Sequence, residues 1–203
     1  NMPPTLVFDA DDTLWDEQGC LQRFEADVEN LLDEATGTRS RFRERFIATE
    51  HDNIPTLGYG FSSYIYSVAE AVTAEPAWRA GKAAVLRRVA ELIACIQPAV
   101  PELIDGVLPT LQSLRDRDYR LVLLTRGVEI EQRAKLDRSG LGPFFSDVRV
   151  VGRKDVDTYR TAALELGDPT GSALCMIGNS MRSDVGPALE AGWSAIHVPA
   201  PTE

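Results

Sequence analysis

The chain has 203 residues, of which 44% are hydrophobic and 26% are charged, so it is a globular protein of one domain or of one domain with an insert. Its 31 acidic and 21 basic side chains give a net charge of −10, which argues against broad binding to nucleic acid or to an anionic membrane. Its three cysteines are widely spaced and form no CxxC pair, which argues against a disulfide framework or a zinc site and indicates a reducing compartment.

The first residues carry no basic segment followed by a long apolar one, and no window approaches the roughly 18 uncharged apolar residues of a membrane helix. We therefore expect neither a signal peptide nor a membrane span. The expected location is the cytoplasm.

In chain order, the first predicted element is an apolar strand at residues 5–8, which ends abruptly at the acidic run Asp9-Ala10-Asp11-Asp12-Thr13. From about residue 15 to residue 95, apolar side chains recur at helical spacing without a comparable β-branched run. This pattern predicts three or four helices. A segment rich in proline, glycine and asparagine predicts a loop among them, at residues 51–60.

After Pro101, predicted helices and strands alternate along the chain. This alternation predicts a parallel sheet with right-handed crossovers. The fold class is therefore α/β, with a core domain at residues 1–14 and 98–203 and a helical insert at residues 15–97. The predicted helices cover residues 107–114, 130–139, 155–166 and 181–191, and the predicted strands cover residues 119–124, 147–151, 173–177 and 194–198.

Ligands bind at the carboxyl ends of the strands in such sheets, so the residues there are the candidates for a functional site. They include acids, two hydroxyls, two arginines, one amine and one amide but no histidine, which argues against a histidine-based triad. Neither GxxxxGK[ST] nor GxGxxG is present, which argues against a P-loop and a dinucleotide fingerprint. The strand-end residues are Asp9, Asp11, Thr125-Arg126-Gly127, Gly152-Arg153-Lys154 and Gly178-Asn179-Ser180, with Asp184 shortly after.

These residue types suit phosphoryl transfer through an aspartyl-phosphate. Asp9 is the expected nucleophile, and Asp11 would protonate the leaving oxygen and later deprotonate water. Since an anion then attacks an anion, a divalent cation is needed, and Mg²⁺ requires only one or two protein carboxylates. Asp9 and Asp184 can supply them. Thr125 and Lys154 can hold the phosphoryl oxygens.

The specificity of this pattern comes from position more than from any one motif. A DxDxT run arises by chance in roughly one chain in ten of this composition. Here it follows the first apolar strand directly. One of the chain's three lysines, Lys154, also falls just past a predicted strand end.

At these residues the sequence resembles the haloacid dehalogenase-like hydrolase superfamily, over essentially the whole chain. The insert resembles the C1 cap of that superfamily. The matching motifs, in order, are Phe8-Asp9-Ala10-Asp11-Asp12-Thr13-Leu14, Leu123-Leu124-Thr125, Lys154, and Gly178-Asn179-Ser180-Met181-Arg182-Ser183-Asp184.

The resemblance implies a Rossmann-like core with helices on both faces of the sheet, and a Mg²⁺-dependent phosphatase. The expected partner is a small soluble phosphate ester, with neither nucleic acid nor membrane. The implied catalytic residues are Asp9, Asp11, Thr125 and Lys154, substrate contacts come from Arg126, Gly127 and Asn179, and the metal lies among Asp9, Asp11, Asp184 and Asn179.

Two departures from the family pattern bear on the site. The fourth motif commonly begins Gly-Asp, whereas here Asn179 follows the glycine, so we expect weaker metal binding but not its loss. Asp155 stands where the family often has proline, and we expect it to cap the next helix. Asp11 favours phosphorus chemistry, because metal-independent dehalogenases of this type usually lack a second aspartate.

Two alternatives share the scaffold. A phosphomutase would return the phosphoryl group of Asp9 to a sugar and not to water. A catalytically silent regulatory or binding protein would keep the pocket without the reaction, and Asn179 gives this second alternative its weight.

Overall fold

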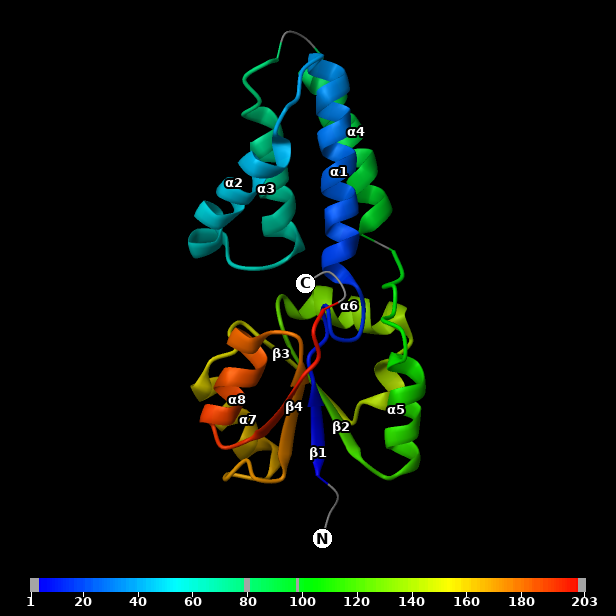
Figure 1. Cartoon of the computed structure of the whole chain (residues 1–203), viewed down its shortest axis with the longest axis vertical. Helices are drawn as coiled ribbons and strands as arrows, with labels where there is room; N and C mark the ends of the chain where they lie inside the picture. Colours follow the sequence, from blue (N-terminus) through cyan, green and yellow to red (C-terminus); the bar gives the residue numbers. More distant parts are fainter. Residues whose placement is uncertain (1–3, 79–80, 98, 201–203) are drawn as a thin grey trace. The chain divides into compact units, whose positions relative to one another are not determined.

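The computed structural model describes residues 4–78, 81–97 and 99–200 (Figure 1). These residues form two compact units, a sheet unit drawn from residues 1–18 and 100–203 and a helical unit drawn from residues 19–99. The predicted domain boundary at residue 98 lies outside the described residues, as do both ends of the predicted core, residues 1–3 and 201–203.

Within the described residues, the sheet unit is built on five parallel strands in the order β3-β2-β1-β4-β5. The chain steps outward from β1 to β3 and then returns to the other side of β1. The strand order therefore reverses between β1 and β4, which is where ligands bind in open parallel sheets. The strands are β1 (Thr5–Phe8), β2 (Arg120–Arg126), β3 (Asp147–Val151), β4 (Leu174–Gly178) and β5 (Ser194–His197).

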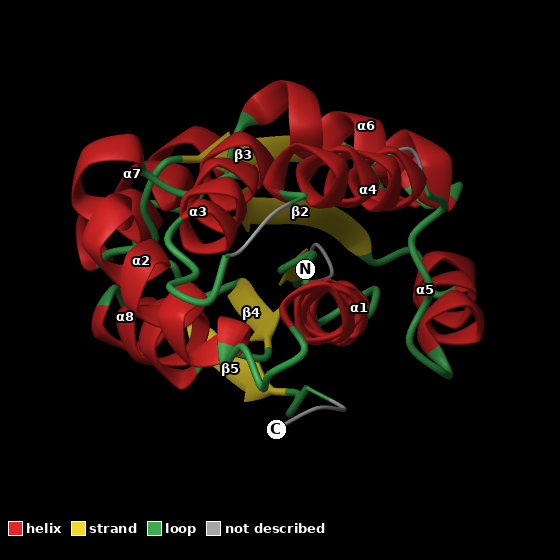
Figure 2. Ribbon diagram, turned by 90° about the horizontal axis from the view of Figure 1, so that it is seen from above, coloured by secondary structure: helices red, strands yellow, loops and turns green. Residues whose placement is uncertain are grey.

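Side chains alternate between the two faces of the sheet, as the period of a strand requires. Phe8 and Leu123 lie on one face, which packs against α5 and α6, and Val7 and Leu124 lie on the other, which packs against α7 and α8 (Figure 2). This arrangement confirms the expected α/β class, with helices on both faces. The helical elements are α5 (Val107–Asp116), α6 (Glu129–Ser139), the 3-10 turn η1 (Gly142–Phe144), α7 (Val156–Leu166), the π turn η2 (Met181–Val185) and α8 (Gly186–Glu190).

The helical unit has four helices in its described part, within the three or four that the periodicity predicted. Their apolar faces meet in one cluster, in which Phe46 packs edge-on against Tyr64 with ring centroids 5.2 Å apart. None of the described helices is both long enough and apolar enough to cross a membrane. The four helices are α1 (Glu17–Thr36), α2 (Phe42–Leu57), α3 (Phe61–Thr73) and α4 (Lys82–Ile96).

The loop predicted at residues 51–60 is wrong, because α2 continues to Leu57 with Pro55 inside it. A proline in the last turn of a helix removes one backbone donor but leaves the preceding turns intact. The helix ends at Gly58, where a φ of 74° turns the chain and the N–H donates to the Ile54 carbonyl at 2.9 Å.

The helix predicted at residues 181–191 also differs from the observed one, because its first turn, Met181–Val185, is a π turn. The N–H of Val185 donates to the carbonyl of Ser180 at 3.1 Å, five residues back. Pro187 has no N–H to offer the Ser183 carbonyl, which instead accepts from the hydroxyl of Tyr159 at 2.9 Å. A contact from α7 therefore pairs the carbonyl that Pro187 leaves without a backbone donor.

Leu174 and Leu164 offer a matched pair for testing the core. Leu174 of β4 is 2% exposed and Leu164 of α7 is 63% exposed. We expect Leu174→Ala to lower the free energy of unfolding by about 2–5 kcal/mol, because it leaves a cavity under the sheet. Leu164→Ala should change it by less than about 0.5 kcal/mol. Urea unfolding followed by circular dichroism measures both, and equal losses would contradict this packing.

Candidate active site

Asp9 lies one residue beyond β1, at the point where the strand order reverses. Its backbone N–H donates to the carbonyl of Ile177 on β4 at 2.9 Å, so the sheet pairing continues one residue past the strand. The Asp9 side chain is buried in consequence. The sheet itself therefore holds this carboxylate at its carboxyl edge.

Lys154 lies between two buried carboxylates. Its ammonium group bonds to Asp9 Oδ1 and, at 2.7 Å, to Asp184 Oδ1. The three residues are 8%, 7% and 1% exposed, in the order Lys154, Asp9, Asp184. One cation between two anions leaves a net charge of about −1 in a site largely removed from water, and such a site attracts a further cation.

The π turn holds the carboxylate of Asp184 in place. The N–H of Ser180 donates to Asp184 Oδ2 at 3.0 Å. Gly178 makes room for this group, because a Cβ at that position would lie 2.4 Å from Asp184 Oδ2. The glycine that begins the fourth motif is thus required by the close approach of the carboxylate.

Thr13 joins Asp9 to Asn179. Its hydroxyl donates to Asp9 Oδ2 at 3.1 Å, and it accepts from the Asn179 N–H at 3.1 Å. The Asn179 amide oxygen lies 3.4 Å from the same hydroxyl. Thr13 was not among the predicted site residues, although its place four residues after Asp9 in the DxDxT run was the available signal.

Asp11 belongs to a second group, on the side of α6. Its Oδ1 accepts from the Trp15 indole at 2.7 Å and from Lys135 Nζ at 2.6 Å, and its Oδ2 accepts from Gln132 Nε2 at 2.9 Å. Gln132 also donates to Thr125 Oγ1 at 2.7 Å, so the predicted residues Asp11 and Thr125 share one donor.

Sequence reasoning missed Trp15, Gln132 and Lys135. The last two lie three residues apart, on one face of the helix that follows Thr125, and Lys135 is one of only three lysines. That spacing was the available signal.

Arg126 and Gly127 lie where β2 ends, and β2 runs two residues further than predicted, so Thr125 is inside the strand. The carbonyl of Arg126 accepts from Gln132 Nε2 at 3.3 Å. Gly127 has a φ of 151°, and a Cβ there would lie 3.1 Å from Gln132 Cγ. Glycine therefore admits the Gln132 side chain, and substrate contacts at Arg126 and Gly127 stay predictions.

Asp155 caps α7 as predicted, since its carboxylate accepts from the Thr158 N–H at 3.0 Å. The neighbouring acid of the first motif, Asp12, accepts from the Gln18 N–H at 2.8 Å, at the start of α1. Its backbone has a φ of 61°. The Asp12 carboxylate therefore stabilises the loop before α1 and does not belong to the buried group of Lys154, Asp9 and Asp184.

Burial raises the pKa of the Asp9 carboxyl to about 6, and the nearby Asp184 adds to this effect while Lys154 opposes it. Burial alone would lower the pKa of Lys154, but its two carboxylate partners outweigh burial and raise it. Lys154 is therefore a cation at neutral pH, and the ionised Asp9 beside it is poorly solvated.

The oxygen donors of this group fit magnesium. The described residues contain no group of three or more aspartate, glutamate, histidine or cysteine side chains arranged around a metal position. Magnesium needs fewer, because it binds through one or two carboxylates and keeps several waters. Asp9, Asp184 and the Asn179 amide oxygen form such a set, whereas Asp11 lies in the separate group beside α6.

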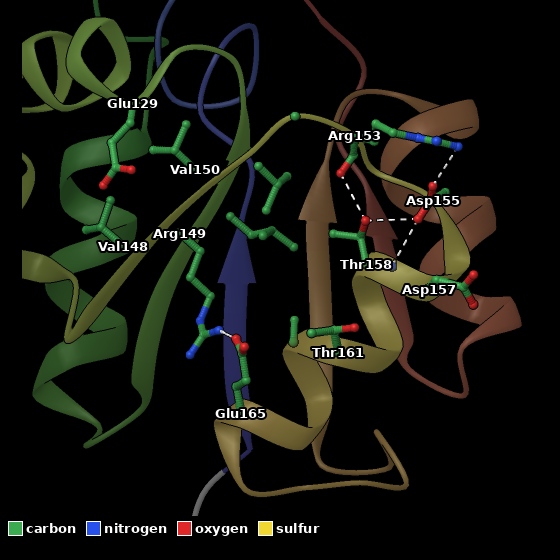
Figure 3. Close-up of a pocket in the computed structure, with 14 residues that line it drawn as sticks. Glu129, Val148, Arg149, Val150, Arg153, Asp155, Asp157, Thr158, Thr161 and Glu165 are labelled. Carbon is green, nitrogen blue, oxygen red and sulfur yellow. Dashed lines mark hydrogen bonds and ion pairs between the residues drawn. The ribbon is translucent and has the colours of Figure 1, made fainter.

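A hollow of about 650 Å³ lies elsewhere on the sheet unit, between β3 and α7 (Figure 3). Four of its charged side chains form two ion pairs, Arg149 with Glu165 and Arg153 with Asp155 at 2.9 Å, and its other acids, Glu129 and Asp157, pair with arginines outside it. None of the predicted catalytic residues lines it. The chemistry of the sequence motifs therefore belongs to the carboxyl edge of the sheet and not to this hollow.

Comparison with known proteins adds independent findings. The family model described as haloacid dehalogenase-like hydrolase matches residues 3–192. A crystal structure of a haloacid dehalogenase-like family hydrolase from Xanthomonas campestris is 32% identical, with a TM-score of 0.85, and the match covers 100% of this chain and 84% of that one.

More distant relatives carry names for specific activities. The glyceraldehyde 3-phosphate phosphatase of Methanopyrus kandleri is 23% identical over 97% of this chain and 84% of its own length. The pyrimidine 5'-nucleotidase PynA of Streptococcus pneumoniae is 29% identical over 46% of this chain and 41% of its own. These names belong to those proteins.

The raised pKa of Asp9 predicts how stability depends on pH. A carboxyl whose pKa is raised by folding favours the folded state below its ordinary pKa of 3.8, and this contribution is lost as pH rises through about 6. The side chain of the Asp9→Asn variant does not ionise, so this variant does not lose stability in this way as the pH rises. We therefore expect its melting temperature, relative to the parent protein in EDTA, to increase between about pH 4 and pH 7.

Differential scanning fluorimetry across this pH range measures the difference. The control is Asp157→Asn, which makes the same substitution at a side chain that is 89% exposed on α7. A flat or falling difference for Asp9→Asn would contradict the burial effect.

Proposed function

The chain belongs to the haloacid dehalogenase-like hydrolase family, and from its site we propose that it is a Mg²⁺-dependent phosphomonoesterase working through an aspartyl-phosphate. The observation that carries the proposal is the position of Lys154 between Asp9 and Asp184, with Asp11 two residues after the nucleophile. A division into a core at residues 1–14 and 98–203 and a cap at residues 15–97 is part of the proposal.

In the first step, the Asp9 carboxylate attacks phosphorus and the ester phosphorus–oxygen bond breaks. Asp11, in its protonated form, gives its proton to the leaving oxygen. In the second step, Asp11 takes a proton from water while the water oxygen attacks phosphorus. The bond from phosphorus to Asp9 breaks, and inorganic phosphate leaves.

Thr125 and Lys154 would hold the phosphoryl group during both steps. Because Gln132 donates to Thr125 Oγ1, the hydroxyl hydrogen of Thr125 is directed to another acceptor, and a phosphoryl oxygen suits it. Lys154 is buried and cationic, which makes it effective against developing negative charge.

Asp9, Asp184 and Asn179 would hold the magnesium ion. When bound, the ion supplies positive charge that offsets the repulsion between the carboxylate and the phosphate. The oxygen donors and the net negative charge of the buried group support this assignment.

We propose a small soluble phosphate ester as the substrate. The two named relatives support this class, since glyceraldehyde 3-phosphate and pyrimidine nucleotides are both small phosphomonoesters. The net charge of −10 makes a large polyanion a poor partner.

The first test is phosphate release from a panel of phosphomonoesters, with Mg²⁺ and with EDTA. We expect release that requires Mg²⁺ and that falls by roughly 10³-fold or more in Asp9→Asn, because the amide is not a nucleophile. The control is Asp12→Asn, which changes the adjacent loop acid. Its activity should stay within about threefold of the parent.

Each alternative has a distinct outcome in this test. Release that appears only with a bisphosphate activator would favour a phosphomutase. No release from folded protein with metal present would favour a silent binding protein. An active Asp9→Asn variant would end the aspartyl-phosphate mechanism.

Asn179 allows a test of the metal site. We expect Asn179→Asp to lower the Mg²⁺ concentration for half-maximal activity by roughly tenfold, or about 1.4 kcal/mol, because it adds a charge to the donor set. The control is Asn30→Asp, which adds the same charge at an exposed position of α1. A lowered Mg²⁺ requirement in both variants, or in neither, would argue against Asn179 as a metal neighbour.

A further inference from the structure

We propose that Lys135 and Gln132 of α6 are positioning residues that hold the Asp11 carboxylate for proton transfer. The proposal rests on the function proposed above, in which Asp11 is the acid and then the base. It adds two residues that lie outside every motif of the sequence analysis.

The Asp11 carboxylate is fixed on both of its oxygens. Lys135 Nζ donates to Oδ1 at 2.6 Å, and Gln132 Nε2 donates to Oδ2 at 2.9 Å. Two donors on different oxygens of one carboxylate restrict its rotation as well as its position. The side chain of Asp11 is still 30% exposed, so a substrate oxygen can reach it.

Lys135 is itself held in place. Its ammonium group also bonds to Glu17 Oε1 at 3.2 Å, and its side chain is only 16% exposed. Here the ammonium group is directed inward between two carboxylates of the same unit.

Gln132 links the acid to the phosphoryl-binding hydroxyl. The same Nε2 that bonds to Asp11 donates to Thr125 Oγ1 at 2.7 Å. The side chain is buried, and Gly127 admits it without a clash. Asp11 and Thr125 are therefore set at a fixed distance from each other by one amide group.

Positioning of an acid has a chemical signature that a purely structural role lacks. Breaking the ester bond needs a proton on the leaving oxygen when that oxygen is a poor leaving group, as in an alkyl phosphate. Nitrophenolate leaves with little need for a proton. Loss of positioning at Asp11 should therefore slow alkyl phosphates more than p-nitrophenyl phosphate.

The experiment compares kcat and KM for p-nitrophenyl phosphate with those for the best alkyl phosphate of the panel. The variants are Lys135→Met and Gln132→Met, with Asp11→Asn as the reference for complete loss of the acid. We expect the ratio of alkyl to nitrophenyl kcat/KM, which reports the steps up to breakage of the ester bond and not the later step that all esters share, to fall by roughly tenfold in both methionine variants. KM should change little, and Lys135→Arg should restore most of the ratio.

Arg133→Met is the matched control, since Arg133 is an exposed cation on the same helix that pairs with Glu129. Its ratio should equal that of the parent. The ratio is taken within one preparation, so a variant that folds in lower yield still gives a valid value.

The proposal is overturned if the ratio is unchanged in both methionine variants while Asp11→Asn lowers it. That result would leave the proposed phosphatase standing. Parent protein that releases no phosphate from any ester with Mg²⁺ would instead remove the proposed function, and the positioning role with it.

Discussion

The buried ammonium group of Lys154 links the two carboxylates on which the rest of the candidate site is built. Lys154 bonds to Asp9 after β1 and to Asp184 after β4, so three separate segments of the chain meet at one charge. Removing one member of such a group typically costs about 3–5 kcal/mol, because the remaining charges lose their partner away from water. The strand order β3-β2-β1-β4-β5 makes the meeting possible, since it brings the carboxyl ends of β1 and β4 side by side.

The two aspartates of the first motif have separate surroundings. Asp9 is buried beside Lys154 and a second carboxylate, while Asp11 is partly exposed beside Lys135 and an amide. Two carboxyl groups with different environments can take different roles, one as an anion and one as a proton carrier. Each aspartate thus has its own lysine, although the chain contains only three.

Sequence reasoning succeeded where local pattern decides the outcome. Lys154 and Asp184 follow strands of the sheet, so their approach to Asp9 could be predicted from a parallel sheet. Gln132 could not be placed in this way, because its role depends on how α6 packs over the end of β2. The π turn was equally hidden, and the Ser183 carbonyl within it bonds to a hydroxyl from α7 that lies distant in the sequence.

That π turn also bears on which changes in chain length the site can tolerate. A π turn holds one residue more than an α turn at the same place. Deleting one residue from this turn ahead of Asp184 would let the segment close into an α turn, so the helix after it would keep its phase and only the residues inside the turn would change direction. Asp184 would then point away from Lys154 with its side chain chemically unchanged. The position of the second carboxylate is therefore encoded in a residue count as much as in a residue type.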